Sequence, residues 1–322
     1  MSRLVRIKVA LGRLRPLLVL RSLAHAKRML RNRALYRRHG IDRGVFRTLA
    51  SRDIPKDGHD QSELPWLDRP GAQAAVADAE GLERFPEPIR EAARRWPEQG
   101  YAVLEGFFEA EHIDRINDEI ETLLSKGKVR FNRGSGRVRN VFKRSPSAAE
   151  ALNDPRLTDL LSFLLGTEVG IWQSISFFRG SQQGAHSDAF HMTTEPPGYL
   201  IVIWVALEDI EPSSGPVFYL PGTHRLPQIA TGDLELANGS RLFVPDKAAG
   251  YYERVKQEVR SSGVQPVRFL PHKGDVLIWH SNLLHGGGPI SDPESTRRSL
   301  VAHYYGEGAL RFHEIAEHPS LV

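Results

Sequence analysis

The 322-residue sequence contains no cysteine. Disulfide bonds and thiolate metal sites are therefore excluded, and any bound metal ion must be held by nitrogen or oxygen ligands. The sequence also lacks a run of about 18 consecutive apolar residues, which a membrane-spanning helix would need. These absences agree with a reducing compartment, and we expect a cytoplasmic protein for which peripheral contact with a membrane surface remains open.

Acidic residues are scarce at the amino-terminal end of the chain. Residues 1–47 contain 14 lysines and arginines against a single acid, Asp42, which gives this arm a charge of +13. The whole chain carries only +4 at pH 7, so the remaining residues sum to −9. A basic arm is thus joined to an acidic body.

The arm has the pattern of an amphipathic helix. Its apolar residues recur at alternating spacings of three and four positions and consist of Leu4, Ile7, Leu11, Leu14 and Leu18. Pro16 should interrupt this helix, because its ring clashes with the preceding turn. We therefore predict a second helix from about Pro16, where a proline is tolerated in the first turn, towards Gly40.

Four functions of residues 1–47 remain open. A basic amphipathic helix can lie on an anionic membrane surface, or it can pack on the acidic body or on a second subunit. It also resembles an organelle targeting peptide, and it could contact nucleic acid phosphates, which we favour least. The oligomeric state is not indicated by the sequence.

Two histidines and an aspartate carry the strongest functional signal. His186 and Asp188 stand two positions apart in GAHSDAFHM, so in an extended segment both side chains point the same way. His285 follows in GDVLIWHSNLLHGGGP, just after an apolar strand. Two imidazoles and one carboxylate, with three positions left open, suit a non-haem Fe(II) oxygenase. The alternative is a solvated surface pair and an ordinary core histidine.

The surrounding segments have strand patterns. VGIWQSISFFRG alternates and is rich in β-branched and aromatic residues, which predicts a strand before His186. Residues 199–207, YLIVIWVAL, are continuously apolar, as in a strand covered on both faces. Three glycines directly follow His285, where they would let the backbone approach a buried ligand closely.

Five ordered segments resemble the phytanoyl-CoA dioxygenase-like family of Fe(II)/2-oxoglutarate-dependent oxygenases, between about Pro97 and Gly306. The segments are GYAVLEGFFEAEHIDRINDEIETLL, HSD, WVALEDIEPSSGPVFYLPGTHR, GDVLIWHSNLLHGGGP and RRSLVAHYY. The resemblance implies a mainly β fold with flanking helices, whose core is a double-stranded β-helix of the jelly-roll type. It also implies an enzyme that uses Fe(II), 2-oxoglutarate as co-substrate and dioxygen.

The resemblance assigns His186, Asp188 and His285 to iron and Arg297 to 2-oxoglutarate. Halogenating relatives replace the aspartate by a small residue, so the carboxylate at this position implies hydroxylation, or an oxidation derived from it. Gln173 matches a glutamine that contacts the co-substrate in some relatives. One departure is Gly287, which stands where some members have a serine that touches 2-oxoglutarate.

The residue chemistry supports the co-substrate assignment separately. A planar guanidinium grips a carboxylate through two hydrogen bonds, as the far carboxylate of 2-oxoglutarate would require. Arg297 and Ser299 are two positions apart on a predicted strand, so both can face the interior while Arg298 faces out. The alternative is that Arg297 forms a surface ion pair.

Substrate contacts are less defined by the sequence. His191, Phe190 and Trp204 are candidates, although His191 could cap a turn and both aromatic residues could belong to the core. The basic stretch 132–144 could face an anionic substrate or remain a solvated loop. Residues 228–263 lack a strand pattern, which predicts a helical insertion that could cover the pocket as a lid.

We therefore divide the chain into a basic helical extension (1–50), a proline-rich linker or wrapping segment (51–88) and an oxygenase domain (89–322). The expected reaction is hydroxylation of an organic substrate, either a lipid or another anionic amphiphile at a membrane surface. One alternative is a soluble oxygenase that tailors a small secondary metabolite. The other is a non-catalytic metal-binding barrel that serves as a partner module.

Overall fold

Two antiparallel sheets enclose an apolar interior in the computed structural model, which describes residues 14–55, 60–132, 136–230, 233–234, 248–315 and 317–319. The larger sheet has the strand order β1-β8-β5-β10-β3-β2, and the facing sheet has the order β7-β6-β9. A third small sheet, β12-β11-β4, completes the described strands. The strand bounds are β1 Tyr101–Leu104, β2 Arg137–Arg139, β3 Val169–Phe177, β4 Thr193–Glu195, β5 Leu200–Ala206, β6 Val217–Tyr219, β7 Val267–Arg268, β8 Val276–His280, β9 His285–Gly287, β10 Ser299–Gly306, β11 Leu310–His313 and β12 His318–Pro319.

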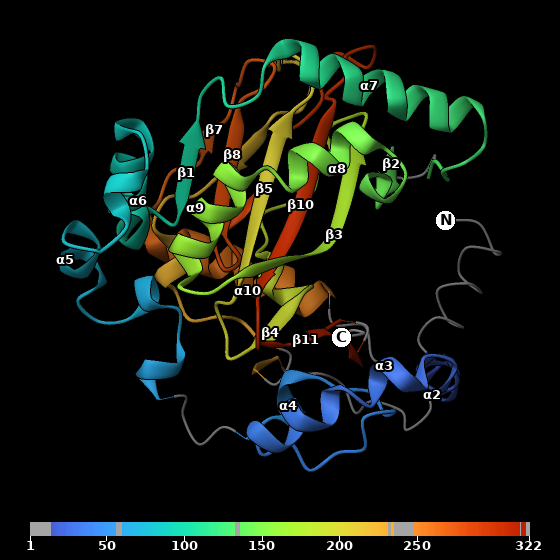
Figure 1. The fold of residues 1–322 in the computed structure, drawn as a ribbon, viewed down its shortest axis with the longest axis vertical. Coiled ribbons are helices and arrows are strands. Elements are labelled where there is room, and N and C mark those ends of the chain that lie inside the picture. Colours follow the sequence, from blue (N-terminus) through green and yellow to red (C-terminus); the bar gives the residue numbers. More distant parts are fainter. Residues whose placement is uncertain are drawn as a thin grey trace.

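Helices cover the outer face of the larger sheet, where α8 and α9 lie across it and α7 follows its upper end (Figure 1). The α-helix bounds are α2 Arg15–Ala24, α3 Ala26–Met29, α4 Asn32–Arg38, α5 Ala72–Ala77, α6 Glu87–Gln99, α7 Ala110–Ser125, α8 Pro146–Leu152, α9 Pro155–Leu165 and α10 Ala248–Ser262. Short 3-10 helices are η1 Ser51–Asp53, η2 Gln61–Glu63, η3 Trp66–Asp68, η4 Leu82–Arg84, η5 Val141–Lys143, η6 Asp188–Phe190 and η7 Thr223–Arg225.

The central strand β5 is apolar at every position because it packs against other residues on both of its faces. Its odd-numbered residues, from Ile201 to Val205, pack in the outer core beneath the helices. Its even-numbered residues, from Val202 to Ala206, pack in the interior between the two sheets. Both faces of the strand are thus buried, and the expected jelly-roll core with helices outside is confirmed.

The described part of the arm forms three short helices, α2 to α4, rather than one helix from Pro16 to Gly40. Pro16 does lie in the first turn of α2, as expected. The chain then turns at His25 and again after α3. These turns bring Met29 and Tyr36 into buried positions, which a straight helix would not do. The predicted stripe at Leu4, Ile7 and Leu11 lies outside the described residues.

The arm is attached to the carboxy-terminal part of the body. Tyr36, Ile41, Val45, Leu49 and Ile54 form an apolar cluster with Leu310 and Phe312 of β11. The buried carboxylate of Glu317 accepts ion pairs from Arg15 at 3.0 Å and from Arg52 at 2.6 Å. Residues 14–55 therefore pack on the protein's own body (Figure 1).

The proline-rich segment also packs against the body. Leu67, Val76 and Phe85 are buried in the same outer core as the helices that cover the sheet. The carboxylate of Asp68 lies 3.1 Å from Nε2 of His280, at the end of β8. The segment thus wraps around the body in its described parts, while the division of the chain into domains stays a prediction.

The predicted insertion at 228–263 contains the helix α10, although residues 231–232 and 235–247 lie outside the described residues. Tyr251 of this helix is fully buried and stacks on Phe190, with ring centroids 3.6 Å apart. Its hydroxyl accepts a 2.6 Å hydrogen bond from the backbone N–H of Ser187. The helix is therefore fixed to the segment that carries His186 and Asp188, and its action as a lid stays a prediction.

None of the described helices is long and apolar enough to cross a membrane.

Candidate active site

The two histidines of the motif are joined through their backbones. His186 and His285 form an isolated antiparallel bridge in which each N–H donates to the other carbonyl at 2.9 Å. Their rings lie 4.4 Å apart between centroids. The closure of the jelly roll thus brings the two imidazoles together from positions 99 residues apart.

The glycines after His285 allow another chain segment to cross this point. A Cβ on Gly286 would come within 2.7 Å of the carbonyl of Gln183, and one on Gly287 within 2.5 Å of the Ser181 hydroxyl. The backbone that approaches here is therefore the segment leading into His186. This close approach is needed for the bridge between the two histidines.

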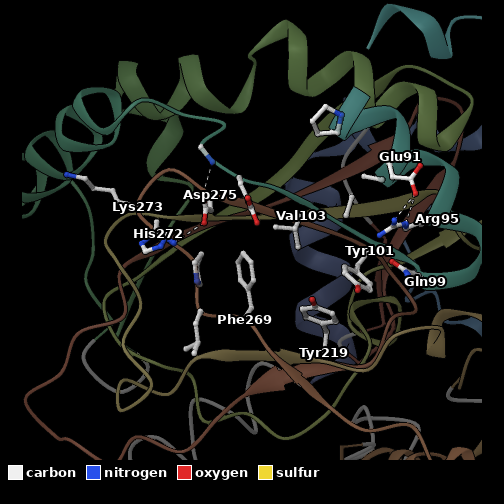
Figure 2. Close-up of a pocket in the computed structure, with 17 residues that line it drawn as sticks. Glu91, Arg95, Gln99, Tyr101, Val103, Tyr219, Phe269, His272, Lys273 and Asp275 are labelled. Carbon is white, nitrogen blue, oxygen red and sulfur yellow. Dashed lines mark hydrogen bonds and ion pairs between the residues drawn. The ribbon is translucent and has the colours of Figure 1, made fainter. Parts of the chain in front are cut away.

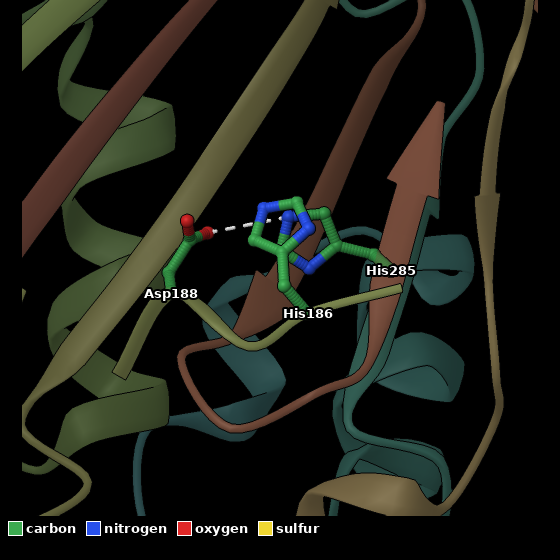
Figure 3. A group of neighbouring side chains, drawn as sticks. All are labelled: His186, Asp188 and His285. Carbon is green, nitrogen blue, oxygen red and sulfur yellow. Dashed lines mark ion pairs between the residues drawn. The ribbon is translucent and has the colours of Figure 1, made fainter. Parts of the chain in front are cut away.

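Ligand atoms of His186, Asp188 and His285 lie within 4.8 Å of one another, and all three residues are buried (Figure 3). We call these residues the ligand triad. Nδ1 of His186 donates to the carbonyl of Gly184 at 2.9 Å, and Nδ1 of His285 donates to the carbonyl of Leu283 at 3.0 Å. Since Nδ1 carries the proton, Nε2 of each ring keeps its lone pair for a metal ion.

The protonation states of the triad suit a divalent cation. Burial, with a contribution from nearby His285, lowers the pKa of His186 to about 3. Burial alone would raise the pKa of Asp188, but His285 and His303 beside it hold this pKa below its ordinary value. A neutral imidazole and an ionised carboxylate are the forms that bind metal ions, so the donor set fits Fe(II).

Two further side chains contact the carboxylate of Asp188. The indole N–H of Trp279 donates to Oδ2 at 2.9 Å. From the other side, Nε2 of His303 lies 3.6 Å from Oδ1. The sequence alone did not single out Trp279 or His303. The signal that was available is their position on β8 and β10, where alternation turns both residues inward.

Arg297 and Ser299 are both buried, and only 2% of Arg297 is exposed. The guanidinium stands between the rings of Phe177 and Trp204, at 5.5 and 5.6 Å from their centroids. Arg298 faces the other way and pairs with Glu121 at 2.7 Å, as alternation predicts. We call this region the co-substrate pocket.

Several donors in the co-substrate pocket have no acceptor. Nε of Arg297, the hydroxyl of Ser299 and the indole nitrogen of Trp204 are buried without a hydrogen-bond partner. Among the described residues no carboxylate lies within 4 Å of the Arg297 guanidinium, although the charge of Glu208 acts on it from farther away. Burial lowers the pKa of Arg297 to about 10, so the group remains charged at neutral pH. Buried donors around an unpaired cation fit the carboxylate of 2-oxoglutarate.

The remaining candidates are spread around the triad. Gln173 of β3 is paired with His303 and donates to the sulfur of Met192 at 2.8 Å. The His191 ring lies 5.5 Å from that of His186, and its buried Nε2 has no hydrogen-bond partner. Burial lowers the pKa of His191, so the ring is neutral at physiological pH.

Both aromatic candidates, Phe190 and Trp204, are buried, as the core alternative allowed. Phe190 is completely buried in the apolar cluster of α10, where its ring is covered by Tyr251. Its ring packs against the helix, and a substrate role for Phe190 stays a prediction. Trp204 lies beside Arg297, whose guanidinium carbon is 5.6 Å from the centroid of the indole ring, and its substrate role likewise stays a prediction.

A groove of about 840 Å³ opens elsewhere, between the edge strand β1 and residues 269–273 (Figure 2). The rings of Tyr101 and Tyr219 lie 4.4 Å apart along its wall. No residue of the ligand triad lines this groove. It is therefore separate from the metal site.

Residues 96–299 match the family model described as phytanoyl-CoA dioxygenase, which covers more than half of the chain. The chain belongs to this family. The expected activity class is thereby confirmed, since the protein is a non-haem iron oxygenase that depends on 2-oxoglutarate.

Two curated relatives are similar to this phytanoyl-CoA dioxygenase family member. An ectoine dioxygenase of Sphingopyxis alaskensis is 28% identical over 233 residues, which are 66% of this chain and 74% of the relative. The peroxisomal phytanoyl-CoA dioxygenase of Rattus norvegicus is 24% identical over 131 residues, which are 38% of this chain and 33% of the relative. The latter match therefore spans only a third of that enzyme.

Two solved structures share the fold of this family member. One is the non-haem α-ketoglutarate-dependent carbocyclase SnoK from nogalamycin biosynthesis, with a TM-score of 0.56, 17% identity and coverage of 72% of this chain and 88% of that one. The other is EctD from S. alaskensis with 2-oxoglutarate and 5-hydroxyectoine, with a TM-score of 0.53, 23% identity and coverage of 72% and 80%.

A methionine at position 297 provides a test of the co-substrate pocket. Arg297→Met removes a buried, unpaired cation, so the melting temperature should stay the same or rise. At 100 times its Kd, 2-oxoglutarate should stabilise the wild type by about 2.7 kcal/mol, and this gain should vanish in the variant. Thermal melts with saturating Mn(II), with and without 2-oxoglutarate, measure both effects. Arg298→Met is the control, and a variant at 297 that still responds to 2-oxoglutarate would contradict the assignment.

Proposed function

We propose that the protein hydroxylates a small organic molecule that carries a negative group. In this proposal His186, Asp188 and His285 hold Fe(II), while Arg297 and Ser299 hold the far carboxylate of 2-oxoglutarate. The observations that carry the proposal are the buried ligand triad and the buried guanidinium of Arg297, which no carboxylate pairs within 4 Å among the described residues. When bound, iron supplies the coupled reaction in which substrate C–H, 2-oxoglutarate and dioxygen give substrate C–OH, succinate and carbon dioxide.

The protein's own residues orient this reaction. Backbone carbonyls fix the tautomers of His186 and His285, so both rings present Nε2 to the same point. The charged guanidinium of Arg297 lies among aromatic side chains. A carboxylate would bind it strongly there, because water does not compete for the hydrogen bonds. Gln173 points inward from β3 and is a further candidate for co-substrate contact.

An anionic substrate is supported by Arg137 of β2. This residue is paired with Phe177, so it lies on the inward face of the larger sheet. Its guanidinium lies 5.7 Å from the Phe177 ring, and no carboxylate pairs with it among the described residues. Burial, followed by the charge of neighbouring Arg139, lowers the pKa of Arg137. His191, whose Nε2 has no partner, offers a second polar contact to the substrate.

A membrane-surface substrate is the second candidate, and the surface of the arm supports it. Leu17, Leu20, Leu23 and Leu30 are 39% to 59% exposed, although most large apolar side chains of the described chain are buried. Arginines of α2 to α4 surround them in the sequence. Exposed leucines beside basic residues suit the headgroup region of an anionic membrane, where an amphiphilic substrate would be found. A soluble small-molecule substrate, taken up in the cytoplasm, needs no such surface.

Succinate formation tests the oxygenase function and separates it from a non-catalytic barrel. With Fe(II), 2-oxoglutarate and air, the wild type should release succinate slowly even without substrate. Asp188→Ala should reduce this release by at least about 100-fold, because a ligand of the metal is lost. The exposed Asp114→Ala is the control and should behave as the wild type. Oxygen uptake and succinate are measured together, and equal rates in all three proteins would exclude the proposed function.

Arg137 is tested by comparing carboxylic acids with their primary amides as stimulants of succinate release. Active compounds should be found among the acids, and Arg137→Gln should raise their KM by about 10- to 100-fold, as expected for a lost charged hydrogen bond. The Kd of 2-oxoglutarate, from the thermal shift, should not change. Preference for the amides, or a change confined to the Kd of 2-oxoglutarate, would contradict a substrate role for Arg137.

Membrane contact is tested by replacing the exposed leucines, since deletion of residues 1–47 would also remove Tyr36, Ile41 and Val45 from the cluster on β11. A triple variant with glutamine at Leu17, Leu20 and Leu23 keeps that cluster. The wild type should sediment with phosphatidylserine vesicles more than with phosphatidylcholine vesicles, and the variant should lose most of this binding. Equal sedimentation of the two proteins would eliminate the membrane-surface candidate.

A further inference from the structure

We infer that Trp279 is a positioning residue of the metal centre, which holds Asp188 so that this carboxylate binds the metal through a single oxygen. The inference rests on the proposed function, since it concerns how the triad would hold a cation. Neither the family resemblance nor the metal-binding motif gives the indole N–H of Trp279 a role.

The geometry around Trp279 makes the indole a fixed donor. The residue lies on β8, the second strand of the larger sheet, which pairs it with Tyr101 of β1 on one side and Val202 of β5 on the other. Only 3% of the side chain is exposed, so the ring is held by its neighbours. An indole N–H can donate but not accept, and when buried it needs an acceptor. That acceptor is Oδ2 of Asp188, at 2.9 Å.

The same ring contacts a second member of the triad. The Trp279 and His285 rings are 4.7 Å apart between centroids and tilted by 43°. Nε2 of His285 lies 3.5 Å from the Oδ2 atom to which the indole donates. Trp279 therefore fixes the orientation of the carboxylate relative to one of the two imidazoles.

The number of carboxylate oxygens on the metal decides how many positions remain open. A six-coordinate metal held by two imidazoles and one carboxylate oxygen would keep three positions, enough for a bidentate keto acid and dioxygen. A carboxylate that bound through both oxygens would occupy one of these positions. A donor hydrogen-bonded to one carboxylate oxygen occupies a lone pair of that atom and resists rotation of the group.

Other polar groups near the carboxylate do not replace this donor. His303 lies 3.6 Å from the opposite oxygen, Oδ1, which is longer than an ordinary hydrogen bond. Removal of the indole N–H would thus leave Oδ2 without its one short donor. The carboxylate could then turn, and the triad would lose its fixed geometry.

Trp279→Phe tests this role because it removes the donor and keeps an aromatic ring. The matched control is Trp96→Phe, which makes the same change in the outer core, where Trp96 is 1% exposed. Co(II) is the probe, and its binding is measured by calorimetry while its visible absorption spectrum reports the coordination number. The Kd for Co(II) should rise by about 10- to 100-fold in the variant at 279, as for other lost partners of metal ligands. Its Co(II) spectrum should also change, and the control should match the wild type in both measurements.

The possible results separate this inference from the proposed function. Wild-type affinity and spectrum in Trp279→Phe would overturn the positioning role alone. An equal loss of affinity in both variants would also overturn it, because the effect would then come from general packing. A wild-type chain that binds no Co(II) would overturn the proposed function, and this inference with it.

Discussion

The backbone bridge between His186 and His285 is the interaction on which the site depends. Each residue donates to the other at 2.9 Å, and this pairing joins two segments that are far apart in the chain. The bridge requires the close approach that Gly286 and Gly287 permit. Once it is formed, the two imidazoles have little freedom, and Asp188 needs only one extended residue, Ser187, to reach them. The jelly roll thus creates the metal site by closing.

The interior keeps polar groups that a core selected for stability alone would not contain. Arg297 is buried between aromatic rings without a carboxylate partner among the described residues, and donors beside it are unsatisfied. An unpaired buried charge is destabilising, so its presence indicates selection for a ligand. Local rules of stability are broken at the residues that we propose bind the co-substrate.

Much of this arrangement could be predicted from the sequence because strand geometry has a simple period. The spacing of Arg297 and Ser299 places both residues inward, and the apolar run of β5 is buried on both faces. The ligand triad could also be predicted, because few structural roles require two histidines and an aspartate in this order. These features depend on local pattern and on five segments shared with a family.

The remaining features depend on contacts between distant segments, which a local pattern does not contain. Phe190 is covered by Tyr251 from a helix some 60 residues later, a contact that its position next to Asp188 in the sequence does not predict. Tyr36 of α4 and the residues after it pack on β11, a contact between distant segments that the sequence period of the arm does not predict. Likewise, the donor role of Trp279 appears only when β8 lies next to the segment of Asp188.

Anaerobic titration of the metal-free protein with Fe(II) in the presence of 2-oxoglutarate tests the central claim most directly. The visible charge-transfer absorption of an iron chelated by a keto acid should appear and saturate at one iron per chain. It should be absent when 2-oxoglutarate is replaced by succinate, which lacks the keto group. Iron binding without this absorption, or saturation at a different stoichiometry, would contradict a single centre that holds the metal and the co-substrate together.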